Sequence, residues 1–418
     1  MNYSLNNILQ NVKQTSHTYA QLTYQQRQSV LKSLSQLIQA QEAKILKNNE
    51  LDLQQLSNTD PKYDRLLLNA ERLSVIRRTI DKILQMPDPL NKILETYDHP
   101  QGMKLVKISV SLGVIAIIYE SRPNVTIDSF ALSFMSGNAC VLKGGKEADH
   151  SNKIFVELIH QALIKNNISV EGVVLLPAQR EMVKKLCHAH GFIDVIIPRG
   201  GNNLIKEVRE NARVPIIETG AGVVHIYFDK VGDINKGRPV ITNSKTRRVS
   251  VCNAVDCLVI HEHRVADLPV LIKDLAIQEV EIFADEKSYH VLHHHYPAHL
   301  LHHAKPENYG IEYLSLKLTI KTVSSFAAAI NHIQTYSSGH SEAIITEDVK
   351  IRDQFLQQVD AAAVYVNAST AFTDGEEFGM GSEIGISTQK LHVRGPFSMQ
   401  HLTTMKWLIY GEGQVRSL

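Results

Sequence analysis

The pattern of apolar and polar positions changes near residue 100. Before about residue 95, apolar residues recur at helical spacing, as in Val30, Leu31 and Leu34 of the segment 25–40. From about residue 104, short continuous apolar runs alternate with helical stretches. Such runs are typical of strands in a parallel sheet that helices cover on both faces. We therefore predict a helical N-terminal region followed by an α/β fold.

The alternation continues in two series and ends in an alternating segment typical of an edge strand. The first series predicts strands at 105–108, 114–118, 139–142, 173–176, 193–197, 214–217 and 223–228, with helices at 148–165, 181–190 and 202–211. The second predicts strands at 255–260, 279–283, 316–323, 343–346 and 362–366, with helices near 266–276, 324–335 and 349–358. The last predicted strand is 402–409.

These series indicate two open α/β domains with parallel sheets. A length of 418 residues fits two or three domains. We expect a first domain over 1–228, a second over 229–367, and a return of 368–418 to the first. A hairpin at 104–118 and the C-terminal strand are expected to form a small β element for oligomerisation.

Charge and cysteine content exclude several classes of protein. Lys and Arg number 44 against 43 Asp and Glu, so no global positive field favours nucleic acid. The four cysteines form no C-x-x-C pair, and the N-terminus has no signal-peptide pattern. The most apolar stretch, 108–118, is far shorter than the ~20 residues that span a bilayer. We expect a cytoplasmic protein without a membrane partner.

Cys252 is the cysteine whose surroundings suggest a chemical role. Arg247 and Arg248 lie just upstream, and positive neighbours favour a thiolate. Its local sequence alone somewhat favours a small buried side chain, as most unpaired cysteines are. Cys140 and Cys257 lie within apolar runs, which predicts packing roles for both.

Two glycine turns follow predicted strands. Lys143 and Lys146 flank one Gly-Gly pair, and Gly200-Gly201 forms the other. Backbone amides at such turns can approach an anion, and parallel sheets bind ligands at this edge. The spacing fits neither a Walker A loop nor G-x-G-x-x-G, so each turn alone could be a plain turn.

Three further segments carry candidate groups. Glu218 ends an apolar run before a glycine-rich turn, where it could be a base or a strand-end hydrogen-bond partner. Around Pro123, Arg122 and Asn124 could be presented at a strand edge, and an Asn amide can donate to an oxyanion. The histidine-rich segment 290–303 lacks a nearby Cys, so we predict a solvated segment and assign no metal site.

Taken together, these segments resemble the γ-glutamyl phosphate reductases, or glutamate-5-semialdehyde dehydrogenases, of the aldehyde dehydrogenase superfamily. The resemblance runs in order over nearly the whole chain. It rests on Glu-Ser-Arg-Pro-Asn-Val at 120–125, Leu-Lys-Gly-Gly-Lys-Glu-Ala at 142–148, Pro-Arg-Gly-Gly-Asn-Asn at 198–203, Glu-Thr-Gly at 218–220, Ser-Val-Cys-Asn-Ala at 250–254 and Glu-Phe-Gly-Met-Gly-Ser-Glu-Ile-Gly at 377–385.

The resemblance implies an aldehyde dehydrogenase-like fold and NADPH-dependent reduction of L-glutamyl 5-phosphate to L-glutamate 5-semialdehyde, the second step of proline biosynthesis. It implies Cys252 as nucleophile, through a thioester, and Asn124 as an oxyanion donor. The residues implied for NADP(H) are Lys143, Lys146, Gly200, Gly201, Glu218 and Glu312, although a water-activating role for Glu218 does not suit this reaction. On charge and position, Arg122, Arg247 and Arg248 are candidates for substrate binding.

Two alternatives stay open. One is a CoA-dependent acyl reductase of the same superfamily. The other is an inactive homologue that serves as a partner of glutamate kinase, against which the retained Cys252, Asn124 and Lys143 argue. The superfamily's habit also implies a homo-oligomer, and association with glutamate kinase is a further expected partnership.

Overall fold

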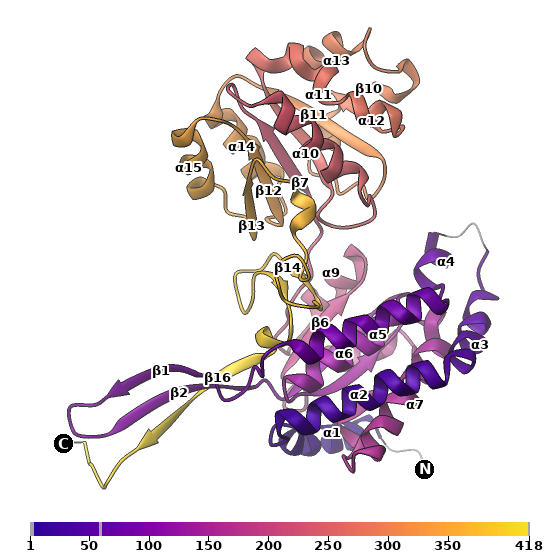
Figure 1. Ribbon diagram of the computed structural model, residues 1–418, viewed down its shortest axis with the longest axis vertical. Coiled ribbons are helices and arrows are strands. Elements are labelled where there is room, and N and C mark those ends of the chain that lie inside the picture. Colours follow the sequence, from indigo (N-terminus) through magenta and orange to yellow (C-terminus); the bar gives the residue numbers. More distant parts are fainter. Residues whose placement is uncertain (1–3, 58–60, 417–418) are drawn as a thin grey trace. The chain divides into compact units, whose positions relative to one another are not determined.

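The protein, described here by a computed structural model over residues 4–57 and 61–416, divides into two compact units (Figure 1). Unit 1 comprises Met1–Thr219, Gly379–Gly385 and Phe397–Leu418, and unit 2 comprises Gly220–Phe378 and Ile386–Pro396. Among the described residues, no helix is long and apolar enough to cross a membrane.

Unit 1 begins with the predicted helical region. Its helices are α1 (Leu5–Tyr19), α2 (Tyr24–Ala40), α3 (Glu42–Leu53), α4 (Pro61–Leu66) and α5 (Ala70–Gln85). The ends are fixed locally: Ser4 caps α1, and Thr23 forms a capping box with Gln26 at the start of α2. Apolar side chains of α2 at helical spacing are buried, including Val30, Leu31 and Leu34.

The sheet of unit 1 is parallel, in the order β5-β4-β3-β6. Its strands are β3 (Val114–Tyr119), β4 (Ala139–Lys143), β5 (Val173–Leu175) and β6 (Val195–Arg199). The helices that accompany them are α6 (Asn124–Met135), α7 (Asp149–Lys165), α8 (Glu181–Cys187) and α9 (Asn202–Asn211). The predicted strand at 214–217 makes an isolated bridge, between Ile216 and Ile196.

The predicted 104–118 hairpin is wrong, although both of its strands exist. β2 (Lys104–Ser111) pairs antiparallel with β1 (Ile93–Asp98) and β16 (Thr403–Tyr410), whereas β3 joins the parallel sheet. Every residue of β3 is buried, which suits a central parallel strand and not an exposed ribbon. The three antiparallel strands form an arm of unit 1, visible in Figure 1.

Unit 2 contains the second parallel sheet, in the order β10-β9-β11-β8-β7-β12-β13. Its strands are β7 (Val224–Phe228), β8 (Val255–His261), β9 (Glu281–Ala284), β10 (Leu301–His303), β11 (Lys317–Val323), β12 (Ser341–Ile345) and β13 (Ala363–Val366). Its helices are α10 (Ile234–Thr246), α11 (Leu268–Leu271), α12 (Lys273–Ile277), α13 (Glu286–Leu292), α14 (Phe326–Tyr336) and α15 (Val349–Gln358). The short strands β14 (Gly385–Ser387) and β15 (Gly395–Phe397) pair with each other.

The boundary between the units differs from the expected break at residue 229. β7 lies in the sheet of unit 2, between β8 and β12, so unit 2 begins at Gly220. The apolar sequence of β7 would suit a buried strand in either sheet. Pairing with strands far along the chain, and not local sequence, decides to which sheet it belongs.

Candidate active site

The first group of candidate residues lies where the strands of the unit 1 sheet end. Lys143 is the last residue of β4, and Gly200 and Gly201 follow β6 and precede α9. A side chain at Gly144 would collide with the Asn152 amide, at 2.1 Å from its Nδ2. Local crowding therefore requires glycine in the turn after β4, which is where a phosphate-binding loop was predicted.

Glu120 is the polar residue at this edge that the sequence analysis did not single out. Its Oε2 accepts a hydrogen bond of 2.9 Å from the Gly201 amide, just before α9. Burial lowers the pKa of Lys143, and the nearby carboxylates of Glu147 and Glu120 oppose that shift. The edge therefore combines backbone donors and a lysine with a competing carboxylate.

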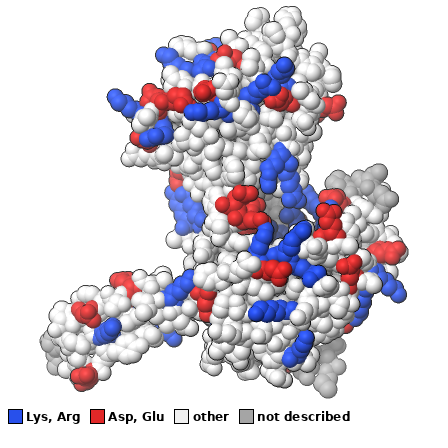
Figure 2. Space-filling view, in the orientation of Figure 1, with Lys and Arg blue, Asp and Glu red and all other residues white. Residues whose placement is uncertain are grey.

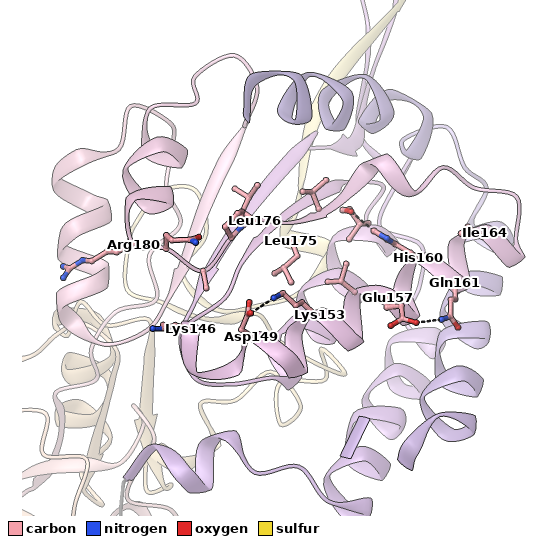
Figure 3. Close-up of a pocket in the computed structure, with 16 residues that line it drawn as sticks. Lys146, Asp149, Lys153, Glu157, His160, Gln161, Ile164, Leu175, Leu176 and Arg180 are labelled. Carbon is pink, nitrogen blue, oxygen red and sulfur yellow. Dashed lines mark hydrogen bonds and ion pairs between the residues drawn. The ribbon is translucent and has the colours of Figure 1, made fainter. Parts of the chain in front are cut away.

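A cavity of about 1140 Å³ opens beside this edge, between α7, β5 and the segment 176–180 (Figure 3). Its charged lining residues include Lys146, Lys153 and Arg180. Lys153 pairs with Asp149 at 2.5 Å, and Arg180 pairs with Glu207 at 2.8 Å. Lys146 makes no ion pair within residues 4–57 and 61–416, so its charge is available to a ligand in the cavity.

Asn124 is the first residue of α6, directly after Pro123. Its Nδ2 donates a hydrogen bond of 3.0 Å to Asp128 Oδ2, one helical turn later. Burial raises the pKa of Asp128 to about 6, against the opposing effects of the Asn124 hydrogen bond and the Arg199 charge. The bond leaves the second N–H of the amide for another acceptor. Arg122, in the same turn, is exposed.

Glu218 is buried and forms an ion pair with Arg209. Its two oxygens accept hydrogen bonds of 2.8 and 2.9 Å from Arg209 Nε, and Arg209 Nη2 adds a third contact. Both carboxylate oxygens of Glu218 are therefore engaged by the Arg209 guanidinium. The geometry is that of a structural ion pair between α9 and the strand end.

Cys252 lies in unit 2, in the loop between α10 and β8. Its thiol is partly exposed, and its Sγ lies 3.1 Å from Nε2 of His340. The loop is held from the side of Asn253, whose amide donates to the backbone carbonyls of Ala371 and Thr373. Asn253, the residue after Cys252, therefore fixes the position of the loop.

His340 was not predicted, and it is fully buried. Its Nδ1 lies 2.8 Å from Ser341 Oγ, which in turn contacts Thr373 Oγ1 at 2.7 Å. Burial lowers the pKa of His340 to about 4, so the imidazole is neutral near pH 7. A neutral ring fixed at Nδ1 can orient the Cys252 thiol through Nε2.

Gly222 packs against the backbone of Cys252. A Cβ at Gly222 would lie 1.6 Å from the Cys252 carbonyl oxygen, so no other residue fits there without movement. The Gly222 amide donates a hydrogen bond of 2.9 Å to Glu312 Oε1. Burial raises the pKa of Glu312. Glu312 therefore supports the segment that contacts the cysteine loop.

The cations upstream of Cys252 have different environments. Lys245 is buried, donates to the Val255 carbonyl at 2.7 Å and lies 3.6 Å from Asp256. Arg247 and Arg248 are exposed and make no ion pair with any residue that the structure describes. The two arginines are therefore the ones of this cluster that can reach an anionic ligand.

Each unit gathers its own part of the predicted set. Unit 1 places Lys143, Gly200 and Gly201 at one sheet edge, while unit 2 places Glu312 and Cys252 on either side of Gly222. His340, Asp128 and Glu120 were missed. A His before an apolar run was the only signal for His340, and many buried histidines share it.

Comparison with known proteins places these features in a family. The sequence model of the aldehyde dehydrogenase family matches residues 3–279. A γ-glutamyl phosphate reductase of Bacteroides fragilis is 53% identical over 387 residues, covering 93% of both chains. The chain belongs to the γ-glutamyl phosphate reductase family. It is thus an oxidoreductase with the aldehyde dehydrogenase-like α/β fold.

Solved structures agree with this assignment. The crystal structure of γ-glutamyl phosphate reductase from Thermotoga maritima superposes with a TM-score of 0.95 at 36% identity, covering 99% of this chain and 100% of that one. An engineered glycolyl-CoA reductase with bound NADP+ shares the fold, with a TM-score of 0.69 at 15% identity over 97% and 96% of the two chains. The predicted fold class and family are confirmed.

Proposed function

We propose that this protein reduces L-glutamyl 5-phosphate to L-glutamate 5-semialdehyde with NADPH and releases phosphate, as the second step of proline biosynthesis. The observation that carries the proposal is the Cys252 thiol, partly exposed and held 3.1 Å from a neutral histidine, in a γ-glutamyl phosphate reductase family chain. The family name of the relatives supplies the substrate class.

Cys252 is the proposed nucleophile. Its sulfur attacks the acyl carbon, the bond from that carbon to the phosphate oxygen breaks, and a thioester remains. The proton that the thiol loses leaves with the phosphate as hydrogen phosphate. Phosphate is a good leaving group, so no strong general acid is required. The Asn124 N–H that is not bonded to Asp128, together with the Cys252 backbone amide, is proposed to hold the oxyanion, and each donor lowers the barrier by about 3 kcal/mol.

NADPH, when bound, supplies the hydride that reduces the thioester carbon. The C–S bond then breaks, which frees the aldehyde and leaves the Cys252 thiolate, and a proton from water restores the thiol. His340 is the proposed positioning residue, since Nε2 holds the sulfur while Nδ1 is fixed by Ser341. Glu218 is proposed to act on the cofactor side only through its ion pair with Arg209, and not as a base.

The cavity beside β5 suits NADP(H). Lys146 lines it without an ion pair among the described residues, which favours the 2′-phosphate of NADPH. Lys143, Gly200 and Gly201 are proposed to hold the rest of the nucleotide at the strand ends, where the parallel fold binds ligands. Glu312 is the proposed cofactor contact in unit 2. Arg122, Arg247 and Arg248 are the proposed contacts for the anionic substrate.

The deciding experiment runs the reaction backwards. NADP+ reduction with glutamate 5-semialdehyde should require inorganic phosphate, and Cys252→Ala should abolish it while NADPH binding is retained. Dependence on CoA would instead support the alternative acyl-CoA reductase. Full turnover by Cys252→Ala would exclude the thioester route, and inactivity of the wild-type protein would favour the role of a silent partner of glutamate kinase.

We also propose a homo-oligomer that uses the β1-β2-β16 arm. A small sheet is stabilised when its apolar face is covered, and this three-stranded one exposes Ile93 at 69%, Met405 at 59% and Ile409 at 61%. Most of the arm's surface in Figure 2 carries no charge. The mass in solution tests this proposal, because a monomer would contradict it. Association with glutamate kinase stays a prediction, testable by co-purification.

A further inference from the structure

A buried cluster of potential metal ligands lies inside unit 2, built from the sheet and one covering helix. His225 of β7 and Cys257 of β8 are register partners on neighbouring parallel strands, so their side chains share a face. His332 of α14 meets them on this face, with Nε2 3.6 Å from Cys257 Sγ. All three residues are buried.

The distances suit a tetrahedral ion. The three ligand atoms lie within 4.8 Å of one another. Zinc bonds of about 2.0 Å to nitrogen and 2.3 Å to sulfur at a tetrahedral angle place the two ligand atoms about 3.5 Å apart. The 3.6 Å between Cys257 Sγ and His332 Nε2 matches that separation.

His225 has the free ring nitrogen that a ligand needs. Its Nδ1 lies 3.3 Å from Glu342 Oε1, while its buried Nε2 has no hydrogen-bond partner among the residues that the structure describes. An unsatisfied polar atom in a closed interior is uncommon and costs free energy. A metal bond at Nε2 would satisfy it. A carboxylate on the opposite nitrogen is the usual outer support of a metal-bound histidine.

Glu342 is itself fixed in place. On β12 it is the register partner of His225, and it accepts a hydrogen bond of 2.9 Å from the His225 backbone amide. Ser337 Oγ donates to its Oε1 at 2.5 Å. With a divalent ion, one thiolate and the Glu342 carboxylate, the cluster carries no net charge, which favours its burial.

We propose that His225 Nε2, Cys257 Sγ and His332 Nε2 bind one Zn²⁺, with Glu342 supporting His225. Thiolate and imidazole donors select zinc or Cu⁺ over magnesium or calcium. On binding, the Cys257 proton is released and the S–Zn bond forms, with no change in oxidation state. The ion would tie β7, β8 and α14 together. This proposal differs from the sequence prediction, which assigned no metal site and gave Cys257 a packing role.

The test uses full-length protein carrying Cys252→Ala, so that the reactive thiol beside His340 cannot capture metal. Protein stripped with a chelator is titrated with Zn²⁺ against a chromogenic competitor, and with Co²⁺ for the thiolate charge-transfer band. We expect one Zn²⁺ per chain and a clear Co²⁺–thiolate band. Absence of either in this protein overturns the proposal, as would uptake of Cu⁺ without Zn²⁺.

Matched variants locate the site. In the same background, Cys257→Ser and His225→Gln should each weaken Zn²⁺ binding by at least 100-fold, and Glu342→Gln by about 10–100-fold. Cys140→Ser, which changes another buried cysteine on β4, should change nothing. A Co²⁺–thiolate band that survives Cys257→Ser would place the metal elsewhere and refute the assignment. Circular dichroism of each variant identifies any that fail to fold, and the titration of the parent protein does not depend on them.

Discussion

Replacing His340 by Gln tests how the Cys252 thiol is held and activated. His340 Nε2 lies 3.1 Å from Cys252 Sγ, a geometry also found in thiolate–imidazolium pairs. Here burial lowers the pKa of His340 to about 4. An ordinary thiol, with a pKa of ~8.5, and such a base differ by ~4.5 pH units, so moving the proton costs ~6 kcal/mol before the attraction between the two charges is counted. We therefore expect a neutral pair.

The assay is the pH dependence of Cys252 alkylation by iodoacetamide, followed on the peptide that contains Cys252. The rate should rise about tenfold per pH unit between pH 6 and 8 in both the wild-type protein and His340→Gln. Cys252→Ala supplies the blank. A rate plateau below pH 6 in the wild-type protein that disappears in His340→Gln would refute the reasoning, since only an ion pair produces it.

Turnover should respond differently from alkylation. Loss of the hydrogen bond that orients the thiol should lower kcat about five- to tenfold, near ~1 kcal/mol. Ser341→Ala is the matched control, since it keeps the imidazole and removes the hydroxyl that contacts both Nδ1 and Thr373, and its loss of kcat should be smaller. Equal losses in both variants would mean that the hydroxyl, and not the ring, positions the sulfur.

The same variant changes the acid stability. A histidine with a lowered folded pKa stabilises the native state fully above its unfolded pKa of ~6.5, and this contribution is lost as the pH falls toward about 4. The difference of ~2.5 units corresponds to ~3 kcal/mol. Urea unfolding between pH 7 and 4 should show a shallower fall for His340→Gln than for the wild-type protein. Parallel curves would mean that the ring takes up its proton without loss of the fold.

Three further changes test other parts of the site. Lys146→Glu should shift the preference from NADPH toward NADH by tenfold or more, since a carboxylate repels the 2′-phosphate, and an unchanged ratio of kcat/KM values would refute that role. Gly222→Ala should lower the stability by more than ~2 kcal/mol, and with it Tm and kcat, because its Cβ would lie 1.6 Å from the Cys252 carbonyl oxygen. A wild-type Tm would show that the backbone around Gly222 can shift. Asp128→Asn should remove any ionisation near pH 6 from the pH profile of kcat. It should also lower kcat about three- to tenfold, since the Asn124 amide loses a charged hydrogen-bond acceptor. A pH profile that keeps this ionisation would assign it to another group.

The sequence by itself determined the elements and the family. The apolar run 114–118 predicted a strand, which the structure has at Val114–Tyr119, and the strand predicted at 343–346 lies at Ser341–Ile345. The motif around Cys252 identified the family that the relatives confirm. These features depend on local periodicity and on residues adjacent in the chain. Such signals survive without knowledge of what packs against them.

Tertiary structure decided which strands pair and which side chains meet. β2 pairs with the distant β16 and not with β3, and β7 belongs to the sheet of unit 2. The residues of a strand do not by themselves determine which other strand it pairs with. His340 reaches Cys252 from 88 positions away, and Cys257 joins two histidines that no spacing rule connects to it. Burial then sets the protonation of His340, since the loss of water, and not a neighbour in sequence, lowers its pKa.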